Sequence, residues 1–141
     1  MVGVHLTASP VDWYAARAAG VVAYVLLTSV VALGLTMSSQ RRLQRWPRFA
    51  IEDVHRFGAI LVGVFVGIHV VTIAIDSYLR FSIAAIAVPF ATSYRPVWTA
   101  LGTVAAELLL ALAVTNRLRN RRLSYAAWRR LHYANLSLIH I

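Results

Sequence analysis

Three long blocks of apolar residues constrain this chain more than any other feature of its sequence. The blocks are Ala18–Met37, Phe57–Ile75 and Val97–Val114, of 20, 19 and 18 residues, and the only charged residue in any of them is Glu107. A helix needs about 20 apolar residues to cross the hydrocarbon core of a bilayer, so each block predicts a membrane-spanning helix. Charged residues make up 13% of the chain, against about 25% in soluble domains, which excludes a soluble fold.

The predicted fold is all-α, an integral membrane helical bundle with four transmembrane helices, the fourth of them truncated. The helices are expected over Trp13–Met37, Glu52–Tyr78, Pro96–Asn116 and from about Ser124 onward. Glu52 and Asp53 are expected in the first turn of the second helix, where carboxylates suit the helix dipole. The apolar segment Phe81–Tyr94 is short and interrupted by Pro89, which predicts an interfacial or re-entrant piece rather than a span.

The basic residues predict an orientation in the membrane. All 14 are arginines, and the net charge is +9. Eight of them lie in two loops: Arg41, Arg42, Arg45, Arg48, Arg117, Arg119, Arg121 and Arg122. Because positively charged loops stay on the cytoplasmic side, the N-terminus is expected outside the inner or plasma membrane, and helices two and four run parallel, from inside to outside. This pattern accounts for the charge without a nucleic acid; the predicted partner is the lipid bilayer.

Two histidines lie on one face of the second predicted helix. His55 and His69 are 14 residues apart, which is about 3.9 turns and about 21 Å along a helix axis. An ionisable residue inside a span is a functional hypothesis by default, and histidine is a common axial ligand of heme iron. The spacing suits two metal centres at two depths; plain packing is the alternative. Nearby Gly58, Gly63 and Gly67 would let a flat macrocycle or another helix approach closely.

A third histidine, His132, lies near the start of the fourth helix, at a depth similar to that of His55. Parallel helices with histidines at matching depth are what a bis-His heme requires, so His55 and His132 are predicted to share one heme. The alternative for His132 is an interfacial residue whose ring reaches the membrane surface. Arg129 and Arg130 beside it either anchor the helix at that surface or neutralise heme propionates. Glu107, inside the third span, needs a partner or a proton, and a structural polar contact is expected for it.

Several stretches carry a family resemblance. They are the Arg-rich loop before the second helix, the His55 and His69 pair, Pro89–Trp98, Ala100–Gly102, Leu112–Thr115 and Ser124–His132. Together these features resemble the bacterial ferric reductase-like transmembrane proteins. That superfamily includes the membrane domains of NADPH oxidases and the heme-binding subunit of periplasmic methionine sulfoxide reductase. The resemblance covers about residues 13–135.

The resemblance implies two b-type hemes, each held by histidines from two helices. His55, His69 and His132 would be axial ligands of the heme iron, and no catalytic residue is assigned. The chain would be the electron-transfer membrane component of an oxidoreductase such as a ferric reductase. Electrons would come from a cytoplasmic flavin or quinol donor and reach an extracytoplasmic acceptor, which is ferric iron, oxygen or a partner protein. FAD and NAD(P)H are expected only through a missing domain or a partner reductase.

The last six residues, Leu136–Ile141, match the translation of a common transposon-end sequencing adaptor. The heme-binding domain is therefore expected over 1–135, and 136–141 is expected to be a non-native tail. The fourth histidine would fall about four turns after His132, beyond Ile141, so two hemes are expected in the full-length protein and at most one here. Two alternatives remain: a non-enzymatic membrane protein or transporter fragment with proton-relay histidines, and a membrane anchor with a single heme.

Overall fold

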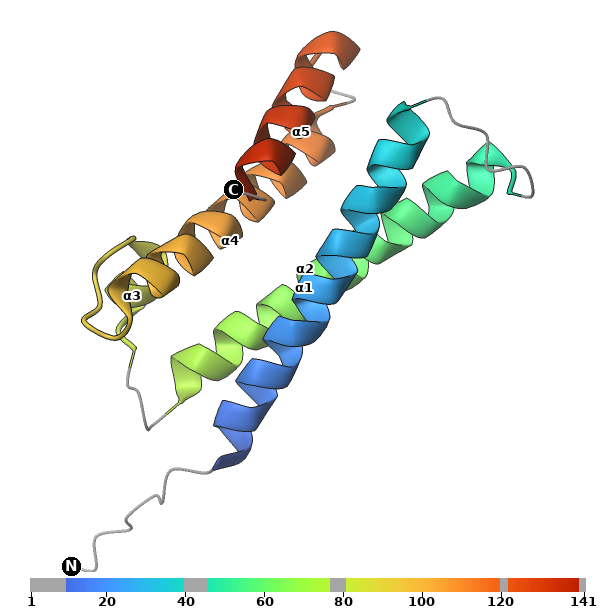
Figure 1. Cartoon of the computed structure of the whole chain (residues 1–141). Helices are drawn as coiled ribbons and strands as arrows, with labels where there is room; N and C mark the ends of the chain where they lie inside the picture. Colours follow the sequence, from blue (N-terminus) through green and yellow to red (C-terminus); the bar gives the residue numbers. More distant parts are fainter. Residues whose placement is uncertain (1–9, 40–45, 77–80, 120–121, 140–141) are drawn as a thin grey trace, which may run out of the picture. The chain divides into compact units, whose positions relative to one another are not determined.

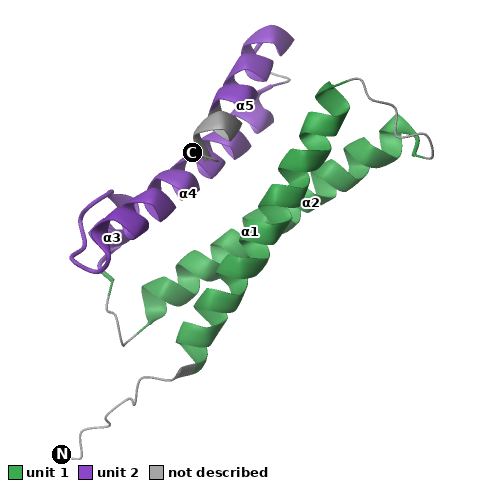
Figure 2. Cartoon of the chain, viewed as in Figure 1, with its two compact units in different colours: residues 1–81 green, residues 82–141 purple. Residues whose placement is uncertain are grey.

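The computed structural model describes residues 10–39, 46–76, 81–119 and 122–139, which are helical apart from the connecting segments. The element order is α1 (Pro10–Ser38), α2 (Arg48–Ile75), α3 (Ile83–Ala87), α4 (Pro96–Leu118) and α5 (Tyr125–Ile139), shown in Figure 1. The prediction of an all-α chain is confirmed over these residues. The chain divides into two compact units, residues 1–81 and 82–141 (Figure 2), and each is described by itself.

Three of the helices are long and apolar enough to cross a membrane. They are α1 from Val11 to Ser38, α2 over its full length, and α4. The spans predicted from the three apolar blocks are therefore confirmed. The fourth predicted helix is present as α5 and begins at Tyr125. Its 15 residues extend about 22 Å, which is less than the hydrocarbon core of about 30 Å.

The segment between α2 and α4 is not a span, as predicted. Over its described residues, 81–95, the one helix is α3, which has five residues, and the Ser82 hydroxyl caps it by accepting a hydrogen bond from the Ala85 N–H at 3.1 Å. Two non-glycine residues beyond it have left-handed backbone conformations, Phe90 with φ 65° and Arg95 with φ 41°. Such conformations mark tight turns, and the second lies directly before Pro96, where α4 begins.

The second helix starts earlier than predicted. It begins at Arg48, directly after the N-cap residue Pro47, which is extended with ψ 146°. Proline lacks the N–H that a helix continued further toward the N-terminus would use. The expectation that Glu52 and Asp53 lie in the first turn is therefore wrong, since no acidic residue lies there. The helix ends before an extended Asp76, and the predicted end, at position 78, lies outside the described residues.

The first unit is a helical hairpin in which α1 packs against α2. The buried side chains of α1 are mostly small: Ala16, Ala19, Ala23 and Val30. On α2, a Cβ added to Gly58 would lie 2.6 Å from Cγ2 of Val30, so this position requires glycine. Small residues let helices approach closely in membranes, where association depends on packing rather than on the hydrophobic effect. Many large apolar side chains of both helices are exposed, which suits a surface that faces lipid.

Candidate functional site

Both histidines of α2 are held by backbone carbonyl groups of α1. The Nδ1 atom of His69 lies 2.7 Å from the carbonyl oxygen of Ala16, and Nδ1 of His55 lies 3.0 Å from that of Val30. Since a carbonyl oxygen can only accept, each Nδ1 carries the hydrogen and donates it. In a neutral imidazole the other nitrogen, Nε2, is then left with a free lone pair. Metal-ligating histidines in proteins commonly have this arrangement.

The two contacts repeat in one register along the hairpin. The accepting residues Ala16 and Val30 are 14 residues apart, as are His69 and His55. The order is reversed between the helices, because the early histidine of α2 meets the late carbonyl of α1, so the helices run antiparallel. The same contact therefore occurs at two depths about 21 Å apart. The prediction that both rings project from one face of α2 is confirmed.

Two glycines of α1, which sequence reasoning missed, make these contacts possible. A Cβ built on Gly20 would lie 3.0 Å from both Nδ1 and Cε1 of His69, and one on Gly34 would lie 3.2 Å from Cε1 of His55. Each glycine stands four residues after the carbonyl that its histidine contacts. A helical side chain leans over the preceding turn, so glycine at this position leaves that carbonyl uncovered. The available signal was that Gly20 and Gly34 are also 14 residues apart.

The glycines that the sequence did single out have other surroundings. Gly58 lies against Val30 of α1, so helix packing accounts for it. A Cβ on Gly63 or Gly67 would meet nothing within 4 Å. The close approach to the two histidines comes instead from the glycines of α1.

The third candidate, His132, belongs to the second unit and is half-buried on α5. Its ring lies 5.1 Å from that of Trp128, one helical turn earlier, at an interplanar angle of 31°. The guanidinium of Arg119, from the end of α4, lies 4.8 Å from the Trp128 ring. The indole of Trp128 therefore contacts both a cation and the imidazole. Because His55 and His132 lie in different units, their predicted pairing stays a prediction.

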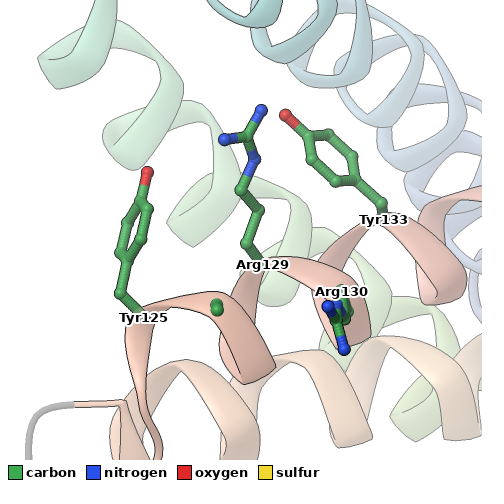
Figure 3. Close-up of a pocket in the computed structure, with 5 residues that line it drawn as sticks. Tyr125, Arg129, Arg130 and Tyr133 are labelled. Carbon is green, nitrogen blue, oxygen red and sulfur yellow. The ribbon is translucent and has the colours of Figure 1, made fainter.

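A shallow pocket of about 410 Å³ lies on α5 (Figure 3). Its lining is Tyr125, Ala126, Arg129, Arg130 and Tyr133. The Arg129 guanidinium lies 5.5 Å from the Tyr133 ring, within cation–π range. The pocket combines positive charge with aromatic surface, which suits either role predicted for the two arginines, membrane anchor or propionate partner.

The imidazoles of α2 fit the chemistry of axial heme ligands. No group of three His, Cys, Asp or Glu side chains that could hold a metal ion occurs among the residues that the structure describes. A heme takes only axial ligands from the protein, and His55 and His69 each offer a half-buried imidazole with its Nε2 lone pair free. Glu107 is exposed on α4, and the polar contact expected for it stays a prediction.

The comparisons with known proteins give one finding. The family model described as "Ferric reductase like transmembrane component" matches residues 19–140, most of the chain. No curated protein and no solved structure is significantly similar to it. The match includes α1 from its third turn onward and all the later helices, with all three candidate histidines.

Proposed function

Because this chain belongs to the family of ferric reductase like transmembrane components, we propose that it transfers electrons across a membrane through b-type heme. The observation that carries the proposal is the pair of imidazoles on α2, both with Nδ1–H bonded to carbonyls of α1. Bound heme would supply one-electron transfer by cycling its iron between the ferric and ferrous states. The protein supplies ligands, orientation and an apolar surrounding.

The residue assignment follows the depth of each histidine. His55 and His132 are proposed to ligate one heme near the cytoplasmic side through Nε2. His69, about 21 Å farther along α2, is too distant to share that iron, so it would serve a separate outer site. Arg129 and Arg130, at the pocket on α5, would lie near the inner site and offset the negative charge of propionates.

Donor and acceptor stand on opposite sides of the membrane in this proposal. A reduced flavin or a quinol would release two electrons and two protons on the cytoplasmic side, where the Arg-rich loops are proposed to lie. Two ferric ions outside would each take one electron and become ferrous; oxygen or a partner protein are the other acceptors. The membrane is proposed to be the inner or plasma membrane, with the N-terminus outside.

The rival function is a proton relay through the same histidines. A relay would pass protons in at one ring nitrogen and out at the other. In this structure, Nδ1–H of His55 and of His69 is already held by a helix carbonyl, so a proton could leave only if that hydrogen bond broke. A static Nδ1–H with a free Nε2 is what ligation requires. The hydrogen bonds therefore favour the ligand role.

Optical spectroscopy of the purified full chain separates the two functions. Protein isolated from membranes of heme-supplied cells should show a Soret band and, on reduction, the α absorption of b-type heme. A pyridine hemochrome assay normalised to protein then gives the occupancy. A chain with a native helical circular dichroism spectrum but no Soret band would contradict the proposal and favour the relay.

A further inference from the structure

We propose that Gly20 and Gly34 are positioning residues that hold the two α2 histidines in the tautomer that ligates iron. This inference rests on the proposed function, because it assigns these histidines as heme ligands. Each glycine leaves uncovered the carbonyl four residues before it, and that carbonyl takes the Nδ1–H of one histidine. Helix α1 thus sets the protonation pattern and the ring orientation at both depths.

The geometry leaves little room for any other residue at these two positions. The His69 ring is fixed by a hydrogen bond of 2.7 Å to Ala16, while a methyl group at position 20 would lie 3.0 Å from two atoms of that ring. A carbon atom rarely approaches that closely, because ordinary contacts begin at about 3.5 Å, so the ring would have to shift by a few tenths of an ångström. A shift of the ring away from this methyl group would weaken its hydrogen bond to the carbonyl oxygen of Ala16. At Gly34 the corresponding distance is 3.2 Å, to Cε1 of His55.

The register shows that the two contacts form a matched pair. The helix-packing explanation of a glycine requires only a nearby side chain, as at Gly58 and Val30. Here each glycine is joined to a histidine, and the carbonyl, the glycine and the histidine all recur at the same spacing of 14 residues. If these glycines served helix packing alone, their neighbours could be any side chain. At both positions the neighbour is instead an imidazole whose Nδ1 contacts a carbonyl oxygen of α1.

The consequence of this arrangement is an effect on the bound metal. A carbonyl that accepts Nδ1–H makes the imidazole a more basic ligand, and loss of such a partner typically lowers metal affinity by about 10- to 100-fold. A more basic ligand stabilises ferric iron relative to ferrous iron. Loss of the hydrogen bond at His55 should therefore raise the midpoint potential of the heme that His55 holds.

The test uses alanine variants of the full chain in detergent. Each variant is measured first without heme and then during titration with heme. Heteronuclear NMR of isotope-labelled histidine rings in the heme-free protein reports which nitrogen carries the hydrogen. Gly20→Ala should lower the population of the Nδ1–H tautomer of His69 alone. Gly34→Ala should lower that of His55 alone. Gly63→Ala and Gly67→Ala are matched controls, since an added methyl there meets nothing within 4 Å, and both should leave the two rings unchanged.

Heme titration then separates this inference from the proposed function. Gly34→Ala should weaken heme binding at the His55 site by about 10- to 100-fold and raise its midpoint potential, whereas Gly20→Ala, which faces His69, should do neither at that site. The inference would be overturned, while the proposed function stands, if the rings in Gly20→Ala and Gly34→Ala matched those of the controls and the heme affinity of Gly34→Ala matched that of the wild type. A wild-type chain that binds no heme would overturn both.

A second variant keeps the test decisive if Gly20→Ala does not fold. The double variant Gly20→Ala/His69→Ala removes the imidazole that the new methyl would meet. Recovery of the helical circular dichroism spectrum in the double variant would show that the imidazole is what requires glycine at position 20. Failure to recover would mean that the glycine serves the packing of α1 alone, which contradicts the inference.

Discussion

The imidazole of His69 donates its Nδ1–H to the carbonyl oxygen of Ala16 across 2.7 Å, from the last third of α2 to the second turn of α1. This single contact fixes three properties of the histidine: its depth in the hairpin, the nitrogen that carries the hydrogen, and the plane of the ring. The contact of His55 with Val30 fixes the same three properties at the second depth. The proposed electron-transfer function depends on both contacts.

Substitution of Gly58 should weaken the helical hairpin itself. In Gly58→Ala the new methyl would lie 2.6 Å from Cγ2 of Val30, and overpacking of this kind typically costs about 1–3 kcal/mol. The gain in helix propensity from Gly to Ala, about 1 kcal/mol, offsets part of this cost. The measurement is the free energy of unfolding in mixed detergents, followed by circular dichroism.

Two further variants serve as controls for that measurement. Gly63→Ala lies on the same helix, and its methyl meets nothing within 4 Å, so it should be neutral or slightly stabilising. Gly58→Ala combined with Val30→Ala should recover much of the lost stability. If Gly58→Ala and Gly63→Ala had the same free energy of unfolding, the close packing of α1 and α2 at Gly58 would be wrong.

Orientation can be tested with single cysteines, because the chain contains none of its own. Ser93, in the loop before α4, is exposed and is proposed to lie outside, so Ser93→Cys should react with a membrane-impermeant thiol reagent added to intact cells. Ser39, at the end of α1, is exposed on the proposed cytoplasmic side. Ser39→Cys should react only after the membrane is breached, and the opposite pattern of labelling would reverse the topology.

Trp128 should orient His132 for ligation. The two rings are 5.1 Å apart, so Trp128→Leu removes the aromatic surface against which the imidazole lies. We expect weaker heme binding, by about 10-fold, the lower end of the range for residues that support a ligand. Trp98→Leu is the control, because that side chain is 73% exposed on α4. Heme titrations giving equal affinity for the two variants would exclude the supporting role of Trp128.

The sequence predicted the spans well because a span depends on length and apolarity, both of which are local properties. The three apolar blocks became α1, α2 and α4, and the break at Phe81–Tyr94 was also correct. The start of α2 was missed because the carboxylates of Glu52 and Asp53 were given more weight than the conformational limits of Pro47.

The candidate site was only partly predictable. The shared face of His55 and His69 follows from helical periodicity alone. Their partners do not, because which carbonyl of α1 meets which ring depends on the register of two helices, which the periodicity of a single helix does not give. Only when that register is known can Gly20 and Gly34 be identified as the small residues of α1 that lie against the two histidines. The predicted pairing of His55 with His132 joins two separate units and stays a prediction.

The central claim is that His55 and His132 ligate the same b-type heme, and electron paramagnetic resonance of the oxidised protein tests it most directly. The wild-type chain should show the low-spin signal of a ferric heme with two imidazole ligands. His55→Ala and His132→Ala should each remove that same signal or convert it to high spin, while the helical circular dichroism spectrum is retained. An unchanged low-spin signal in both variants, or none in the wild type, would contradict the account.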